Sequence, residues 1–315
     1  MTEKPLVSIL CVAYNQKDYI AQTIEGFLMQ KVDFPIEILI HDDASTDGTA
    51  EIIKSYEAKH PELIKGIYQK ENQYSKGVKV WHTFLFPIAR GKYFAECDGD
   101  DYWSNPDKLQ KQVSYLEAHP DCGLTYGIVR QYNQKKKAFL TNRGCDYISF
   151  EHFLSKKNCI PALTACYRKD LMLQFDRTIQ PAQYHWKMGD FPLWLWFIHN
   201  SKVKFFPEIF GVYRIQDNSA AHSSDIEKQI AFYKSAHGCA QGFCKLYRHN
   251  ERPPFEGHRE RGRRYSTRSH DRRKAYLEYK LIPNKNWKYK LLTILHSNSV
   301  TFLLLRLYHS IKYRQ

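Results

Sequence analysis

The residues best suited to chemistry lie in one short stretch, Glu96–Trp103, where Asp98, Asp100 and Asp101 place three carboxylates within four positions. The preceding segment 91–95 is typical of a short buried strand, so these acids should stand at a strand end. Clustered carboxylates repel one another unless a positive charge lies between them. A hard divalent cation, Mg²⁺ or Mn²⁺, is the usual partner, and it keeps positions open for substrate phosphates. An acidic surface turn is the alternative for this stretch taken alone.

The first half of the chain alternates apolar runs with segments of helical periodicity. This order predicts a mostly parallel sheet with helices on its faces. The predicted strands are 6–13, 36–40, 64–69 and 92–97, and the predicted helices are 18–30, 50–59 and 81–89. Ligands bind beyond the carboxyl ends of the strands in such sheets. Tyr14, the pair Asp42 and Asp43, and the acids of residues 98–101 all fall at that edge, so we expect them to meet there.

The second half is predicted to continue the α/β pattern. A helix begins near Pro106, because proline is favoured in a first helical turn, and it runs to about Ala118. The other predicted elements are strands 123–132 and 161–167, a helix over 169–175, and two short strands within 202–213 that Pro207 separates.

Asp190 stands directly before a very apolar segment, Phe191–Ile198, that is predicted to be helical. One interpretation is a helix N-cap, which aspartate favours because its carboxylate accepts a free backbone N–H. The other is a carboxylate in a partly desolvated pocket, where it is suited to act as a base. The two roles are compatible, so both stay open at this point.

The basic charge of the chain belongs to its last segment. The net charge is +14, and residues 226–315 hold 20 lysines and arginines against 6 acidic residues, whereas residues 1–225 hold 27 of each. The eight cysteines form no CxxC pair, so no zinc site is predicted. Residues 1–5 lead directly into a strand without a signal peptide, and no apolar run approaches the ~20 residues that span a bilayer. We therefore expect a cytoplasmic protein with a basic appendage.

The ordered motifs resemble those of the family 2 glycosyltransferases, which have the GT-A fold. The segment Val7–Asn15 is similar to the opening strand of that family, and Asp42–Thr49 (DDASTDGT) is similar to its DD-x-S-x-D-G-T signature. Asp98–Asp101 (DGDD) resembles its DxD motif. The resemblance is close over residues 5–130 and looser to about residue 220. It implies a Rossmann-like, mostly parallel sheet flanked by helices, followed here by a basic helical C-terminal extension.

The resemblance also implies a role for each candidate residue. Donor binding falls to the strand-end residues Ala13, Tyr14 and Asn15, with Tyr14 packing on the nucleotide base, and to four acids, Asp42, Asp43, Asp98 and Asp100. Asp43, with Asp42, would accept a hydrogen bond from the base, and Asp98 or Asp100 would bind the ribose. Asp100 or Asp101 would ligate Mn²⁺ or Mg²⁺, and spacing alone does not decide between these two. Asp190 would be the catalytic base that takes the proton of the acceptor hydroxyl, in a single displacement that inverts the anomeric carbon.

These roles imply a metal-dependent hexosyl- or hexosaminyltransferase for surface polysaccharide or glycan synthesis. It would move a sugar from a nucleoside diphosphate donor, with UDP expected, to a hydroxyl of a glycan or lipid-linked glycan. Residues 1–130 would bind the donor, 131–225 would hold the acceptor and the base, and 226–315 would form the extension. One departure is Tyr213–Gln216 (YRIQ), where many relatives have Y-R-x-H. The alternatives are a non-catalytic GT-A-like binding protein and a nucleic-acid-binding protein that uses the basic tail.

Residues 286–315 combine leucines at helical spacing with flanking lysines and arginines. This pattern is typical of a helix that lies on an anionic membrane surface, which predicts peripheral attachment to the inner face of the membrane. A helical cap on the catalytic body is the alternative. A nucleic-acid partner is not expected, because no recognition motif accompanies the basic residues.

Overall fold

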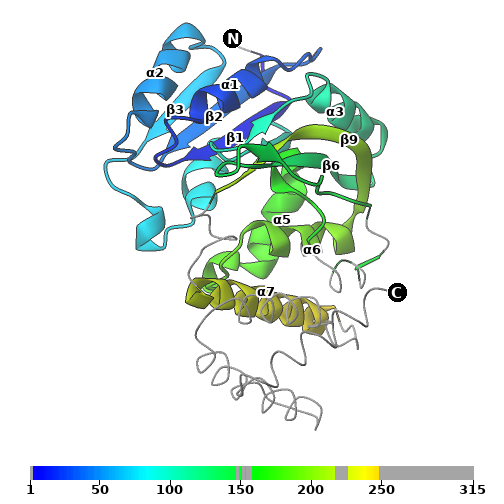
Figure 1. Cartoon of the computed structure of the whole chain (residues 1–315). Coiled ribbons are helices and arrows are strands. Elements are labelled where there is room, and N and C mark those ends of the chain that lie inside the picture. The colour runs from blue at the N-terminus through cyan, green and yellow to red at the C-terminus, as the bar shows by residue number, and fades with distance from the viewer. Residues whose placement is uncertain (1–2, 147–148, 151–152, 154–157, 217–225, 248–315) are drawn as a thin grey trace.

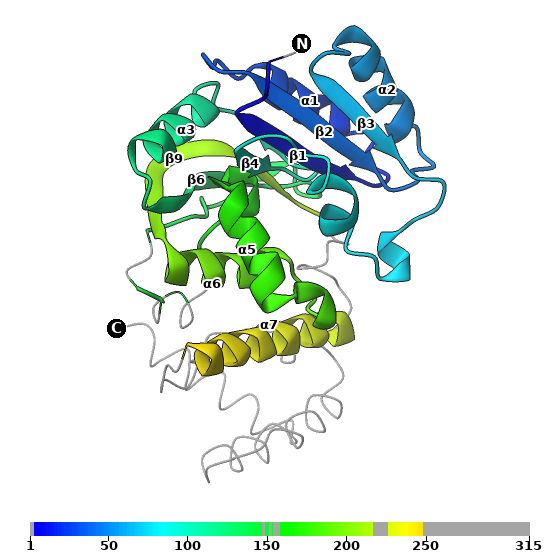
Figure 2. The same ribbon diagram turned by 180° about the vertical axis from the view of Figure 1, so that it is seen from behind.

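The computed structural model describes residues 3–146, 149–150, 153, 158–216 and 226–247. Within these residues the strands form one nine-stranded sheet in the order β3-β2-β1-β4-β8-β6-β9-β5, with β7 paired to β6. Helices α1 and α2 flank one end of the sheet, α5 and α6 pack beneath its other half, and α7 runs across them (Figures 1 and 2). The predicted α/β architecture, a mostly parallel sheet flanked by helices, is confirmed.

The first half of the chain forms the parallel part of the sheet, as predicted. Its strands are β1 (Val7–Ala13), β2 (Ile36–Asp42), β3 (Ile64–Tyr68) and β4 (Tyr93–Glu96), with helices α1 (Ile20–Leu28) and α2 (Thr49–Lys59) between them. The apolar runs form strands because both of their faces are buried; Val7, Ile9 and Leu10 are fully inaccessible. In the register of β1 with β2, Ala13 lies opposite Asp42, so the two predicted site segments leave the sheet side by side.

The second half completes the sheet and places most of the remaining helices against it. Its elements are β5 (Tyr102–Trp103), α3 (Lys108–Ala118), β6 (Cys122–Asn133), β7 (Ala138–Phe139), β8 (Cys166–Arg168), α5 (Lys169–Ile179), α6 (Asp190–Asn200), β9 (Lys202–Ile215) and α7 (Ile226–Leu246). Short helical turns are η1 (Tyr74–Lys76), η2 (Trp81–Leu85), η3 (Ala162–Thr164) and η4 (Pro181–Gln183). Strand β8 is antiparallel to both β4 and β6. Strand β6 crosses residue 130, the predicted boundary between the donor-binding and acceptor-binding parts, so the two parts share one sheet.

Two strand predictions were wrong. The two short strands expected within 202–213 are one continuous strand, β9, because Pro207 sits where the pairing with β6 shifts register and needs no ladder hydrogen bond there. The strand expected over 161–167 is mostly the turn η3, followed by the short β8. Thr164 explains this turn, since its hydroxyl and its N–H both donate to the carbonyl of Pro161, at 2.8 and 2.9 Å.

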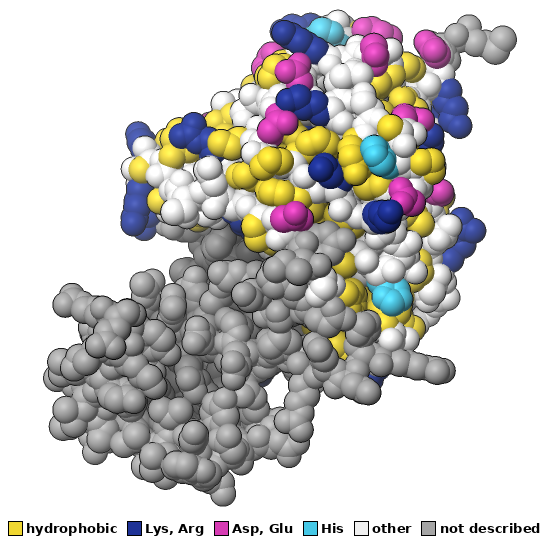
Figure 3. Space-filling view, turned by 90° about the vertical axis from the view of Figure 1, so that its right-hand side faces the viewer, with side chains coloured by type: hydrophobic (Ala, Val, Ile, Leu, Met, Phe, Trp, Pro, Cys, Tyr) yellow, Lys and Arg dark blue, Asp and Glu magenta, His cyan; other side chains and the backbone are white. Residues whose placement is uncertain are grey.

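The sheet separates two apolar cores. One packs the inward residues of β1 and β2 against α1 and α3, and the other packs β4, β6 and β8 against α5, α6 and α7. Trp103 connects β5 to the η3 turn, because its indole N–H donates to the Leu163 carbonyl at 2.7 Å. Acidic and basic side chains are interspersed on the face shown in Figure 3, as expected for a body with balanced charge.

Helix α7 begins the predicted basic extension and packs on the second core through Cys239 and Phe243. The segment 286–315 lies outside the described residues, so its predicted membrane attachment stays a prediction. In the part of the chain that the structure describes, no helix is long and apolar enough to cross a membrane.

Candidate active site

Two loops at the carboxyl ends of β1 and β2 are tied together by the polar residues of the DDASTDGT segment. The backbone N–H groups of residues 15, 16 and 17 donate to the side chains of Ser45, Thr49 and Asp47, at 2.9, 2.8 and 3.0 Å. The Asn15 carboxamide returns a contact by accepting the Thr46 N–H at 2.8 Å. These hydrogen bonds hold the loop that carries Tyr14, whose side chain is 47% exposed. They also explain why the motif contains serine, aspartate and threonine at these positions.

Asp42 and Asp43 are buried beneath these loops, with only 2% and 1% of their surfaces exposed. Asp43 accepts the N–H groups of Gln73 and Tyr74 at 2.8 and 3.0 Å, and its own N–H donates to the Ala13 carbonyl at 2.9 Å. Asp42 accepts the Ser45 N–H at 3.1 Å. In this structure the pair therefore fixes the surrounding turns, and among the described residues the Oδ1 atom of Asp42 has no hydrogen-bond partner.

The DGDD loop is pinned against β1 and α1. The Thr23 hydroxyl contacts the carbonyls of Gly99 and Asp101 at 2.9 and 2.6 Å, and the Gly99 N–H donates to the Val12 carbonyl at 2.9 Å. A Cβ atom at Gly99 would lie 2.4 Å from the Gln16 side-chain oxygen and 3.0 Å from the Ala13 Cβ, so a larger residue would have to displace the Gln16 side chain, which favours glycine. The central glycine of the motif is thus explained by packing.

The neighbouring acids Asp100 and Asp101 have different environments. Asp101 is 3% exposed and accepts the Arg214 N–H of β9 at 2.7 Å, so its carboxylate joins two strands. Asp100 is partly exposed, and among the described residues its carboxylate accepts the Gln216 carboxamide N–H, at 3.0 Å. Arg214, which is buried between the rings of Tyr19 and Tyr102, also donates to the Asp100 carbonyl. Asp100 is therefore the freer of the two predicted metal ligands.

Asp98 lies close enough to Asp190 for the two charges to interact, although Asp190 is ninety-two positions later in the chain. The pKa of Asp98 is raised to about 8, chiefly by the enclosing protein and then by the charges of Asp100, Glu96 and Asp190. Part of the Asp98 side chain is nevertheless exposed. The structure thus brings the DGDD loop and Asp190 to one place.

Asp190 is the first residue of α6, and Gly189, not Asp190, occupies the N-cap position. Its carboxylate still accepts a helix N–H, that of Phe191 at 2.7 Å, and it accepts the Asn158 carboxamide N–H at 2.7 Å. Burial raises the pKa of Asp190, while Arg143 and these two hydrogen bonds oppose the rise. The result is an oriented carboxylate of increased basicity, which is what a general base requires. Asn158 and Arg143 could not be predicted from the sequence, because their loops carry no motif.

Glu96 is a further buried acid at this edge of the sheet, and it lies outside the DGDD motif. It ends β4, and the Tyr167 hydroxyl of β8 donates to its carboxylate. Burial raises the pKa of Glu96 to about 7, and Asp190 adds to the rise while Tyr167 and His82 oppose it. Its position at the end of β4, two residues before Asp98, is the feature by which the sequence could have identified it as a site residue.

Glu96 gives a testable pH dependence of stability. Because its pKa is about 7 when folded and 4.5 ordinarily, the folded state binds more protons between these values, and Glu96 progressively lowers the free energy of unfolding as the pH rises through them. The free energy of unfolding of a Glu96→Gln variant, relative to that of the wild type, should therefore increase by about 2 kcal/mol from pH 5 to pH 8. Urea unfolding of both proteins at both pH values, in EDTA, measures this gain. A difference between the two proteins that stays constant with pH would contradict it.

The donor set fits a divalent cation. Asp100 offers oxygen ligands, and a cation there would relieve its repulsion with the neighbouring carboxylate of Asp98. Among the described residues there is no group of three potential protein ligands. Mg²⁺-type sites commonly use one or two carboxylates and complete their shell with water and substrate phosphates, so the carboxylate of Asp100 suffices.

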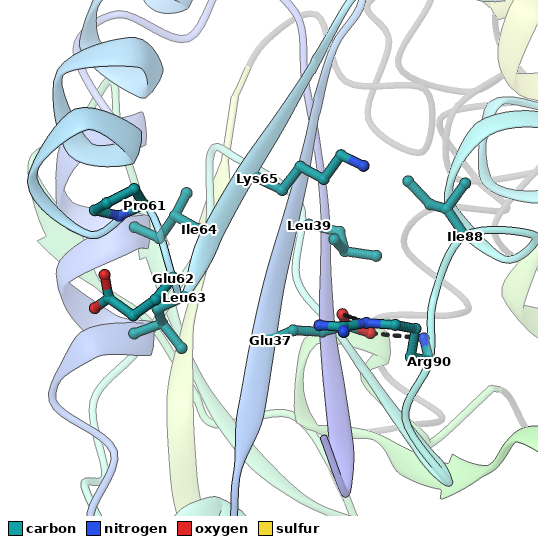
Figure 4. A pocket seen from close by; sticks show the side chains of 9 residues that line it. All are labelled: Glu37, Leu39, Pro61, Glu62, Leu63, Ile64, Lys65, Ile88 and Arg90. Carbon is teal, nitrogen blue, oxygen red and sulfur yellow. Dashed lines mark hydrogen bonds and ion pairs between the residues drawn. The ribbon is translucent and has the colours of Figure 1, made fainter. Parts of the chain in front are cut away.

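A separate hollow of about 340 Å³ lies toward the start of β2, away from the strand ends that carry the site (Figure 4). The ion pair of Glu37 and Arg90, at 2.8 Å, forms one of its walls, and Leu39, Lys65 and Ile88 lie around it. It contains none of the predicted site residues.

The fold and this arrangement of acids define a GT-A glycosyltransferase architecture. Two solved structures share it. The first is Staphylococcus aureus TarS 1–349 in complex with UDP-GlcNAc, with a TM-score of 0.57 and 17% identity over 87% of this chain and 76% of that one. The second is the mannosyltransferase PcManGT from Pyrobaculum calidifontis in complex with GDP-Man and Mn²⁺, with a TM-score of 0.54 and 16% identity over 98% and 88% of the two chains.

The chain belongs to glycosyl transferase family 2, whose family model matches residues 8–173. An uncharacterized Mycobacterium tuberculosis protein is 32% identical over 242 residues, which are 74% of this chain and 66% of that protein. The Escherichia coli UDP-Glc:alpha-D-GlcNAc-diphosphoundecaprenol beta-1,3-glucosyltransferase WfaP is 40% identical over 112 residues, 36% of this chain and 41% of that one. The predicted family is thereby confirmed.

Proposed function

We propose that this protein is an inverting, metal-dependent glycosyltransferase that moves a hexose or N-acetylhexosamine from a UDP-sugar to a hydroxyl of a glycan or lipid-linked glycan. The observation that carries the proposal is the convergence of Asp98 and Asp100 with Asp190, a base candidate from the other half of the chain. Family membership supports sugar transfer, and the UDP-sugar in the TarS structure and in the activity named for WfaP supports the choice of nucleotide.

The residues divide the reaction between them. Tyr14 offers an exposed ring for the base, Asp98 binds the ribose, and Asp100 holds the cation. When bound, Mn²⁺ or Mg²⁺ supplies positive charge that stabilises the departing diphosphate. Asp190, oriented by Asn158, takes the proton of the acceptor hydroxyl as its oxygen attacks the anomeric carbon. Attack from the face opposite the leaving group inverts that carbon. The roles of Asp42 and Asp43 at the base, the cytoplasmic location and the membrane attachment stay predictions.

A thermal-shift panel tests the donor half of this proposal. UDP-sugars should raise the melting temperature in the presence of Mn²⁺, because a ligand that binds only the folded state stabilises it, and EDTA should remove most of the shift. GDP-sugars and free UDP serve as comparisons. If no nucleotide raises the melting temperature, or if EDTA leaves the shift intact, the proposal is wrong. Binding of a nucleotide sugar without transfer would instead favour the alternative of a non-catalytic GT-A-like binding protein.

A further inference from the structure

The segment just before Asp190 carries an aromatic pair that the catalytic roles do not use. The rings of Tyr184 and Trp186 stack with centroids 4.4 Å apart and planes 5° from parallel. Trp186 is half-buried, with the Phe243 ring of α7 6.3 Å away, whereas Tyr184 is 46% exposed. The stack is therefore anchored on one side and open to solvent on the other.

This segment is held from two directions. The Lys187 N–H donates to the Ser235 hydroxyl of α7 at 2.8 Å, and the Lys79 ammonium donates to the Trp186 carbonyl at 3.3 Å. Lys79 follows the η1 turn, at whose start the N–H groups of Gln73 and Tyr74 donate to Asp43. Trp186 is thus connected through Lys79 to the segment that contacts Asp43, and Trp186 itself lies four residues before Asp190. A Cβ atom at Gly189 would meet no atom within 4 Å, so there is open space beside the peptide that leads into Asp190.

Two lysines flank the aromatic pair. Lys79 is partly buried, and burial together with the nearby charge of Lys187 lowers its pKa. Neither ammonium forms a salt bridge with a carboxylate in the described part of the chain, although five other lysine and arginine side chains there do so. Two neighbouring ammoniums without a counter-anion favour an anionic ligand.

We propose that Tyr184, Trp186, Lys79 and Lys187 form the acceptor subsite, and that the acceptor is a saccharide linked to a phosphate or diphosphate. Its sugar ring lies on the open face of the aromatic stack, and its phosphate lies between the two ammoniums. A pyranose ring has an apolar face that suits an aromatic ring, and a preformed stack loses little freedom on binding. This inference rests on the proposed function, since it assigns the acceptor of that same site.

Binding of simple ligands tests the subsite without turnover. The probes are the 1-phosphates of glucose, galactose, mannose, N-acetylglucosamine and N-acetylgalactosamine, each beside its free sugar, measured by ligand-observed NMR with the nucleoside diphosphate and Mn²⁺ saturating the donor site. At least one sugar phosphate should bind at least tenfold more tightly than its free sugar. Tyr184→Ala, Lys79→Gln and Lys187→Gln should each weaken it about tenfold, whereas Tyr184→Phe and Lys79→Arg should restore most of the affinity.

Phe139→Ala is the matched control, because Phe139 is an aromatic residue of equal exposure (47%) on β7, apart from the site. It should leave binding unchanged. If no sugar phosphate binds, if free sugars bind equally well, or if the variants and the control behave alike, the subsite is wrong. Equal binding of the free sugars would indicate a neutral glycan acceptor instead. Donor binding in the thermal-shift panel is independent of these outcomes, so failure of the subsite is distinguishable from failure of the proposed function.

Discussion

An Asp190→Asn variant is expected to lose sugar transfer by about 10³-fold while its affinity for the nucleotide sugar stays within a few-fold of the wild type. Asparagine keeps the shape of the side chain and an oxygen for the Phe191 N–H, but it cannot take up a proton at neutral pH. General-base groups typically contribute factors of about 10² to 10⁴, and a sugar hydroxyl is a poor nucleophile without one. The measurement pairs calorimetric titration of the donor with release of nucleoside diphosphate in a membrane extract that supplies lipid-linked saccharides.

Asp170 offers a matched control for this variant. It lies in the first turn of α5, and its carboxylate accepts the next backbone N–H, that of Leu171, at 2.9 Å, as Asp190 does for Phe191. Asp170→Asn should leave transfer unchanged, which separates the loss of a base from the loss of a helix-end contact. Transfer by Asp190→Asn at a rate near that of the wild type would remove Asp190 from the mechanism.

An Asp100→Asn variant is expected to lose the metal-dependent part of donor binding and to reduce transfer by at least a hundredfold. Asp100 is the partly exposed carboxylate of the DGDD loop, and removing its charge weakens the hold on the cation. Charge stabilisation by a bound metal contributes several kcal/mol to such reactions, and each 1.36 kcal/mol is about tenfold in rate. Donor titrations with Mn²⁺ and with EDTA should then nearly coincide in the variant.

Asp101→Asn is the matched comparison for Asp100→Asn, because it removes the charge of the adjacent carboxylate. Asp101 accepts the Arg214 N–H of β9 from a buried position, and an asparagine oxygen can still accept it. This variant should keep a melting temperature near that of the wild type, and it should keep the difference between Mn²⁺ and EDTA. The reverse pattern, with metal dependence lost at residue 101 and kept at residue 100, would assign the cation to Asp101.

The sequence predicted the parallel half of the sheet because its strands are continuous apolar runs that end in polar residues. Convergence of Tyr14, Asp42 and Asp98 at one edge followed from topology alone, since parallel strands share their carboxyl edge. It did not predict the second half as well. Pro207 looked like a strand break, and only the pairing of β9 with β6 shows that a register shift accommodates it.

The roles of individual acids were harder to predict than their location. Asp101 resembles Asp100 in sequence, yet its partner Arg214 comes 113 positions later, so no local pattern reveals that it is already occupied. The same holds for Asp43, which binds the turn at residues 73 and 74. Asn158 and Arg143 act on Asp190 from loops without a motif, and only the folded chain brings them together.

Donor affinity and transfer rate, measured together in Asp190→Asn and Asp100→Asn, test the central claim most directly. The claim is that the DGDD loop holds the cation and donor while Asp190 handles the proton of the acceptor. It predicts that Asp190→Asn binds the donor in a metal-dependent manner and does not transfer, and that Asp100→Asn loses the metal dependence. Donor binding that survives in Asp100→Asn with its metal dependence intact, together with transfer by Asp190→Asn, would contradict it.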